Sequence, residues 1–106
     1  MFTGIIQDIG EVTSIDKKGD WTIMIATNKY PLERTAIGAS IACNGICLTV
    51  IEKGTARSQK SDRVWFKVQL SAETLARSTA KNWVEGTEIN LEPALRMGDE
   101  LGGHLV

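Results

Sequence analysis

The chain has few histidines and cysteines, the residues that most often form structural zinc sites or, for cysteine, covalent cross-links. Its 106 residues include one histidine, His104, and two cysteines, Cys43 and Cys47. A structural zinc site needs four ligands, which these three side chains cannot supply, so we expect no metal centre. A small secreted domain held by disulfides usually carries more cysteines. We therefore interpret both thiols as small, buried hydrophobic side chains in a cytoplasmic protein.

The sequence also has neither an excess of one charge nor a long apolar segment. The 12 basic and 13 acidic residues nearly cancel, which leaves no electrostatic basis for binding nucleic acid or an anionic membrane. No apolar run approaches the ~20 residues of a membrane-spanning helix. The start of the chain lacks the basic and apolar regions of a secretory signal. The length fits a single domain over residues 1–106.

Proline is also rare, with 2 residues against 10 glycines, and short β-branched runs alternate with turn signals. This pattern is typical of all-β proteins. We predict strands at residues 4–14, 21–27, 63–70 and 87–91, and a hairpin over residues 39–53. About six strands in so small a domain favour closure, because closure removes exposed strand edges. The predicted fold is a small closed six-stranded antiparallel barrel of the Greek-key type with one or two short helices.

The hairpin over residues 39–53 carries the strongest local signal. Asn44-Gly45 lies between two apolar runs and favours a two-residue type I′ turn, which needs positive φ at both positions. The apolar face of this hairpin would consist of Ala39, Ile41, Cys43, Ile46, Leu48 and Val50. The opposite face would consist of Ser40, Ala42, Cys47 and Thr49. We assign the first face to the core, whereas the second is either a solvated surface or the floor of a site.

Helical structure is expected in two short segments. Ser71 can cap a helix over residues 72–77 by accepting a hydrogen bond from a first-turn N–H. Glu73 suits the positive end of that helix. The loop over residues 28–35 has room for one helical turn. The cluster of Ser71, Glu73 and Thr74 is therefore either a helix cap or part of a site.

The familiar catalytic motifs are absent, including the nucleophile elbow, the P-loop, the dinucleotide fingerprint and the H-E-x-x-H motif. Histidine is the side chain that exchanges protons most readily near neutral pH. His104 is accordingly either a proton carrier or a surface residue near a frayed end of the chain. Ser40, Cys47 and Thr49 together suit hydrogen bonding to a polar heterocycle.

Four segments together resemble the first half of riboflavin synthases. They are MFTGII at residues 1–6, GASIACNGICLTV at 38–50, SAETLARST at 71–79 and GTEINLEPALRMGDELGGHLV at 86–106. The resemblance covers nearly the whole chain, apart from residues 28–35 and 53–63. It implies the N-terminal barrel of a two-barrel enzyme whose second barrel is not in this sequence.

The resemblance also implies a reaction that uses neither a metal nor an organic cofactor. In this family two molecules of 6,7-dimethyl-8-ribityllumazine exchange a four-carbon unit, which gives riboflavin and 5-amino-6-ribitylamino-pyrimidinedione. The substrate ring is its own electron sink, so the protein mainly positions two rings and moves protons. The implied ligand is one riboflavin or lumazine per chain. The implied assembly is a homotrimer for the two-barrel enzyme and a homodimer for an isolated barrel.

Site residues follow from the same resemblance. Those that match polar residues implicated in activity are Ser40, Cys47 and His104. Those that match ligand-binding segments are Phe2, Gly4, Ile5, Ile6, Cys47, Leu48, Thr49, Gln69, Leu70, Ser71, Ala72, Glu73, Thr74, Gly103, His104 and Leu105. The predicted hairpin already places Ser40, Cys47 and Thr49 on one face.

Three functions fit these observations. The chain is the N-terminal domain of the enzyme, a stand-alone carrier or fluorescent antenna for riboflavin or lumazine, or an interaction module with a degenerate pocket. The presence of Ser40, Cys47 and His104 favours the enzyme, because a carrier needs no groups for proton transfer.

Overall fold

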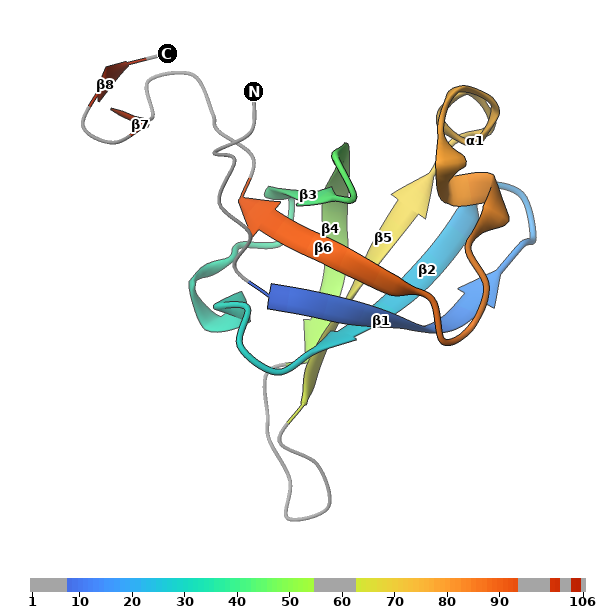
Figure 1. Cartoon of the computed structure of the whole chain (residues 1–106). Coiled ribbons are helices and arrows are strands. Elements are labelled where there is room, and N and C mark those ends of the chain that lie inside the picture. Colours follow the sequence, from blue (N-terminus) through green and yellow to red (C-terminus); the bar gives the residue numbers. More distant parts are fainter. Residues whose placement is uncertain (1–7, 55–62, 94–99, 102–103, 106) are drawn as a thin grey trace.

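Six antiparallel strands close into a barrel in the computed structural model, which describes residues 8–54, 63–93, 100–101 and 104–105 (Figure 1). The strands are β1 (Asp8–Asp16), β2 (Trp21–Thr27), β3 (Ser40–Cys43), β4 (Ile46–Gly54), β5 (Val64–Leu70) and β6 (Glu88–Pro93). Their order around the barrel is β1-β2-β5-β4-β3-β6. Strands β3, β4 and β5 follow one another, and β6 returns to lie beside β3, which is a Greek key. The predicted fold class is confirmed.

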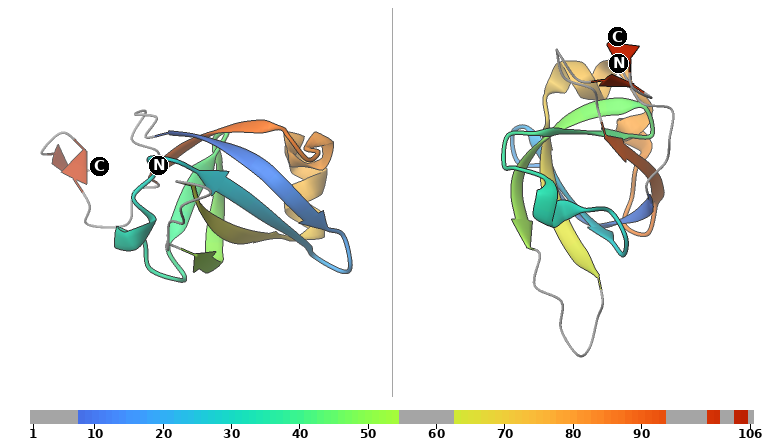
Figure 2. Two further views of the ribbon diagram at one scale, coloured as in Figure 1. Left: turned by 90° about the horizontal axis from the view of Figure 1, so that it is seen from below. Right: turned by 90° about the vertical axis from the view of Figure 1, so that its left-hand side faces the viewer.

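The helical segments flank this barrel. A 3-10 turn, η1 (Leu32–Arg34), follows β2, and the short helix α1 (Ala72–Arg77) and a second turn, η2 (Thr79–Asn82), follow β5. The Ser71 hydroxyl accepts a hydrogen bond from Thr74 N at 3.2 Å, as a helix cap does. Figures 1 and 2 show α1 at the same end of the barrel as the β1–β2 turn. Strands β7 (Glu100–Leu101) and β8 (His104–Leu105), which the sequence did not predict, form a separate two-stranded sheet.

The β3–β4 hairpin has the turn and the register that the sequence predicts. Asn44 and Gly45 have φ angles of +50° and +81°, and Ser40 pairs with Thr49 as Ala42 does with Cys47. Asn44 also bonds β6, since its Oδ1 accepts from Asn90 N at 2.7 Å and its N–H donates to Asn90 O at 2.9 Å. The turn is thus tied to the strand that closes the barrel.

The barrel interior is filled by alternate side chains of every strand. In β5 the alternate residues Val64, Phe66, Val68 and Leu70 are all buried. Gly10 of β1 is also buried, and a Cβ there would approach Ile25 Cγ2 to 2.7 Å and Leu91 Cδ1 to 2.9 Å. A glycine at this position therefore allows β1 to lie close to the core.

Several details of burial differ from expectation. Cys43 is fully buried, but Cys47 is exposed, so the interpretation of both thiols as buried was wrong for Cys47. Ala42 belongs to the small, polar face of the hairpin and is nevertheless fully buried, whereas Ala39, expected in the core, is only half-buried. Strand β1 runs to Asp16, beyond the predicted end, and residues 4–7 of the predicted strand lie outside the described residues. The differences in burial arise because the exposure of a side chain depends on which other strand or loop packs against it.

The Asp8 carboxylate joins the start of β1 to the end of β2. Its Oδ2 accepts hydrogen bonds from the Thr27 hydroxyl and from the N–H groups of Asn28 and Lys29, the last two at 3.0 Å. Partial burial acts to raise the pKa of Asp8, but the hydrogen bonds from Thr27 and from the backbone outweigh burial and hold the pKa below 3.8. The ionised carboxylate therefore stabilises the chain reversal after β2.

This arrangement predicts a pH-dependent loss of stability. The contribution of Asp8 is fully present above the unfolded-state pKa of 3.8 and disappears as the pH falls through its lower folded-state value. We expect Asp8→Asn to lower the free energy of unfolding by about 1 kcal/mol at pH 7, a value reduced for solvent screening. Chemical denaturation should show this difference shrinking towards about pH 2.

The matched control is Asp16→Asn, because Asp16 accepts a single exposed hydrogen bond, from Lys18 N at 3.0 Å. Its effect should stay within about 0.5 kcal/mol. Equal losses of unfolding free energy in Asp8→Asn and Asp16→Asn at neutral pH would contradict the role assigned to Asp8.

Candidate functional site

A pocket of about 380 Å³ opens on the outside of the barrel, where β4, β5 and the start of α1 meet the β1–β2 turn. Its lining residues are Asp20, Cys47, Leu48, Thr49, Ile51, Gln69, Ser71 and Thr74. Most of them are exposed, so the pocket faces solvent. Residues from three separate parts of the sequence thus converge on one surface.

The alternation of side chains along β4 and β5 creates this surface. In β4, Leu48 and Val50 are buried, and the intervening Cys47 and Thr49 face outwards. In β5, Gln69 is exposed beside the fully buried Leu70. The same strands therefore build the core with one face and the pocket with the other.

An irregularity in β4 adds an apolar side chain to the pocket. Val50 pairs with Val68 and Glu52 pairs with Lys67, so Ile51 is an extra residue without a counterpart on β5. Ile51 is 41% exposed, and it lines the pocket. Bulges of this kind redirect a side chain and occur often beside active sites. The bulge gives the polar pocket one hydrophobic contact surface.

Hydroxyl groups dominate the end of the pocket near α1. The Ser71 and Thr74 hydroxyl oxygens lie 3.2 Å apart, and the Ser71 oxygen also caps the helix. Ser71 therefore combines the cap that the sequence predicts with a place in the pocket lining. With the Thr49 hydroxyl and the Gln69 amide, these groups offer donors and acceptors to a neutral polar ligand.

Of the two thiols, only Cys47 is accessible to a ligand. Desolvation raises the pKa of Cys43, and the neighbouring Cys47 raises it further. Burial likewise raises the pKa of Tyr30 to about 12, with a contribution from Cys43. Cys43 and Tyr30 therefore stay neutral near pH 7 and act as core residues, whereas Cys47 reaches solvent in the pocket.

The predicted site residues divide into three groups. Those that line the pocket are Cys47, Leu48, Thr49, Gln69, Ser71 and Thr74. Those that are described but lie outside its lining are Ser40, Leu70, Ala72 and Glu73. Those whose side chains lie outside the described part of the structure are Phe2, Gly4, Ile5, Ile6, Gly103, His104 and Leu105. The backbone of His104 belongs to β8, where it pairs with Leu101.

Two lining residues were not predicted from the sequence. Asp20 comes next to Trp21, which pairs with Leu70, and this long-range register brings Asp20 to Ser71. Ile51 lines the pocket because of the bulge. Both positions depend on pairings between strands that are far apart in the sequence.

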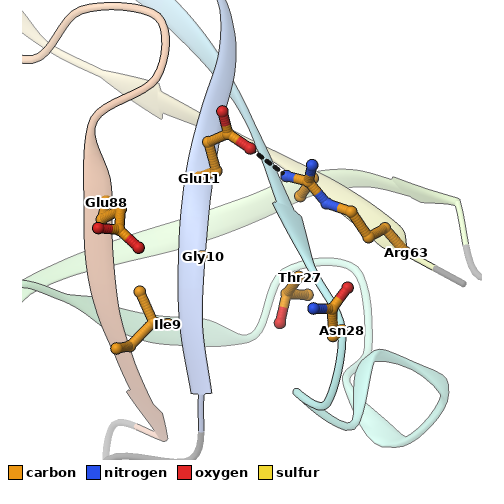
Figure 3. Close-up of a pocket in the computed structure, with 8 residues that line it drawn as sticks. Ile9, Gly10, Glu11, Thr27, Asn28, Arg63 and Glu88 are labelled. Atoms are coloured by element: carbon orange, nitrogen blue, oxygen red, sulfur yellow. Dashed lines mark ion pairs between the residues drawn. The ribbon is translucent and has the colours of Figure 1, made fainter. Parts of the chain in front are cut away.

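A second pocket of about 190 Å³ lies on another part of the barrel surface, between β1, β2 and β6 (Figure 3). Arg63 and Glu11 form an ion pair across it, with 2.8 Å between Nη2 and Oε1. Glu88 projects from β6 on the opposite side of β1. None of the predicted site residues whose side chains are described lines this pocket, so we place the candidate site in the larger pocket.

Two features are absent from the described residues, a cluster of metal-ligating side chains and a membrane-spanning helix. Over residues 8–54 and 63–93, no three or more histidine, cysteine, aspartate or glutamate side chains lie together as metal ligands would. None of the helices in the described part of the chain is long and apolar enough to span a membrane.

Comparison with known proteins shows which family the chain belongs to. A family model described as "Lumazine binding domain" matches residues 3–94. Curated relatives include a protein named riboflavin synthase from Brucella abortus, 44% identical over 109 residues, which cover all of this chain and 51% of the relative. Proteins of the same name from Meyerozyma guilliermondii and Photobacterium phosphoreum are 40% and 41% identical, each with 45% of its length covered. The chain spans about half the length of these relatives, and it belongs to the lumazine-binding domain family.

Proposed function

We propose that the chain is the N-terminal ligand-binding barrel of a riboflavin synthase and that it holds one molecule of 6,7-dimethyl-8-ribityllumazine or riboflavin. The convergence of Cys47, Thr49, Gln69, Ser71 and Thr74 on one pocket carries the proposal. These residues come from the segments that resemble the enzyme, and three separate elements bring them together. The names of the curated relatives support the same activity.

The proposed reaction transfers a four-carbon unit between two lumazine molecules. The polar lining would orient one ring, and the exposed Cys47 thiol would act as a weak donor or nucleophile beside it. Ser40 and His104 are proposed to assist proton transfer. Because the lumazine ring is its own electron sink, the reaction needs neither a metal nor an organic cofactor. The second ligand would be held by a second barrel, since the chain spans about half the length of its relatives.

The first test is ligand binding by the chain itself. We expect riboflavin to bind with one molecule per chain and its fluorescence to be quenched. Thr49→Val should weaken binding about 3- to 10-fold, because it removes one hydrogen-bonding group from the pocket. The matched control, Thr13→Val, alters an exposed threonine of β1 outside this pocket and should leave the affinity unchanged.

Fluorescence titration and calorimetry should agree on this result. If neither method detects binding of riboflavin or the lumazine at ~100 µM, a weak threshold of about −5.5 kcal/mol, the pocket is not a flavin site.

The second test is turnover in a chain with two barrels. Residues 1–106 would be joined to the part of the Brucella abortus relative that lies beyond the match. His104→Gln should slow conversion of the lumazine by about 10² to 10⁴, the usual contribution of a general acid or base. Cys47→Ser should also slow conversion, with a smaller effect on riboflavin affinity.

Melting curves of the same variants provide the control for structure. We expect stability changes below about 1 kcal/mol, as is usual for substitutions away from a packed core, and Cys47 is exposed. If the melting temperature and the rate both fell sharply in these variants, the residues would be structural. Binding without turnover in the unmodified two-barrel chain would favour a carrier.

We also propose that the isolated barrel associates as a two-fold dimer, in which a second copy takes the place of the missing barrel. Closed two-fold dimers are the commonest oligomers, and an unpaired contact surface tends to be covered again. Sedimentation should show a dimer that riboflavin strengthens. A strict monomer at high concentration, with and without ligand, would contradict this part of the proposal.

A further inference from the structure

Asp20 is the one charged residue among the described residues that line the larger pocket. The other lining residues contribute hydroxyl, amide, thiol and hydrocarbon groups, with neither lysine nor arginine among them. Within the described part of the chain, the Asp20 carboxylate has no recorded hydrogen bond or ion pair. It is therefore available to a ligand, and it gives this end of the pocket a negative charge.

The fold fixes where this charge lies. Gly19 turns the chain between β1 and β2 with a φ of +66°, and the following ladder pairs Trp21 with Leu70. Asp20 is thus held next to Ser71, at the end of the pocket where the Ser71 and Thr74 hydroxyls lie. The nearby Lys17 ammonium lies over the Trp21 ring, 4.6 Å from its centroid, and does not line the pocket.

We infer that Asp20 makes this pocket selective for a ligand with a neutral polyol chain over the same ligand ending in a phosphate. The inference rests on the proposed function, which supplies the ribityl chain. An ionised carboxylate only accepts hydrogen bonds, so it complements hydroxyl groups, which donate them. A phosphate monoester carries nearly two negative charges and brings mainly acceptors. The Asp20 carboxylate would repel such a phosphate, because both groups are negatively charged. The described lining residues include no cation that would offset this repulsion.

The experiment compares riboflavin with riboflavin 5′-phosphate, two ligands that share the same ring. Fluorescence titration of the unmodified chain should give a dissociation constant about tenfold or more higher for the phosphate. Asp20→Asn keeps the shape of the side chain and removes its charge. It should therefore lower the ratio of the two dissociation constants, riboflavin 5′-phosphate over riboflavin, about three- to tenfold, mainly by tightening phosphate binding. This decrease should be smaller in high salt, because Asp20 is exposed and its field is screened.

Glu33→Gln is the matched control, because it also removes one exposed negative charge but lies in η1, outside the pocket. It should leave the ratio unchanged. The inference would be overturned if the ratio of dissociation constants were the same in the unmodified chain and in Asp20→Asn, or if Asp20→Asn and Glu33→Gln changed it equally. Riboflavin binding in the same experiment would still uphold the proposed function. Failure of both ligands to bind the unmodified chain would overturn the two together. Melting curves would show that Asp20→Asn is folded, as expected for an exposed turn residue.

Discussion

Barrel closure by β6 is the constraint on which the rest of the structure depends. This strand pairs with β1 on one side and β3 on the other, so all six strands have two neighbours. Without β6 the sheet would have two open edges, and its inner face would lose Ile89 and Leu91. The bonds between Asn44 and Asn90 attach the β3–β4 hairpin to the closing strand. The position of β4, and hence of the pocket on its outer face, follows from that closure.

Closure also separates most of the residues that stabilise the barrel from those that line the pocket, and among the described residues Leu48 belongs to both groups. Leu48 and Val50 point inwards, whereas Cys47 and Thr49 point outwards from the same strand. Substitutions in the pocket therefore need not create cavities in the core, where losses of several kcal/mol are typical. Changes of binding and changes of stability can be measured as distinct effects in such a barrel.

Local signals in the sequence predicted more of the fold than of the site. The hairpin at Asn44-Gly45 depends on positive φ angles of two adjacent residues, and its register follows from that turn alone. The Ser71 cap depends on a contact three residues away. Asp20, Ile51 and Ala42 were misplaced or missed because their surroundings depend on strands far apart in the sequence. The resemblance supplied most of the remaining site residues, several of which lie outside the described structure.

The location of the pocket on an outer wall limits how it can enclose a flat molecule. The outside of a closed barrel is convex, so β4 and β5 can support one face of a planar ring and leave the other face open. An open aromatic face in water remains an apolar surface that favours a second cover. A single copy of this wall would thus cover only one face of a planar ligand. A planar ligand on this wall would be covered on both faces only if a second surface lay opposite β4 and β5.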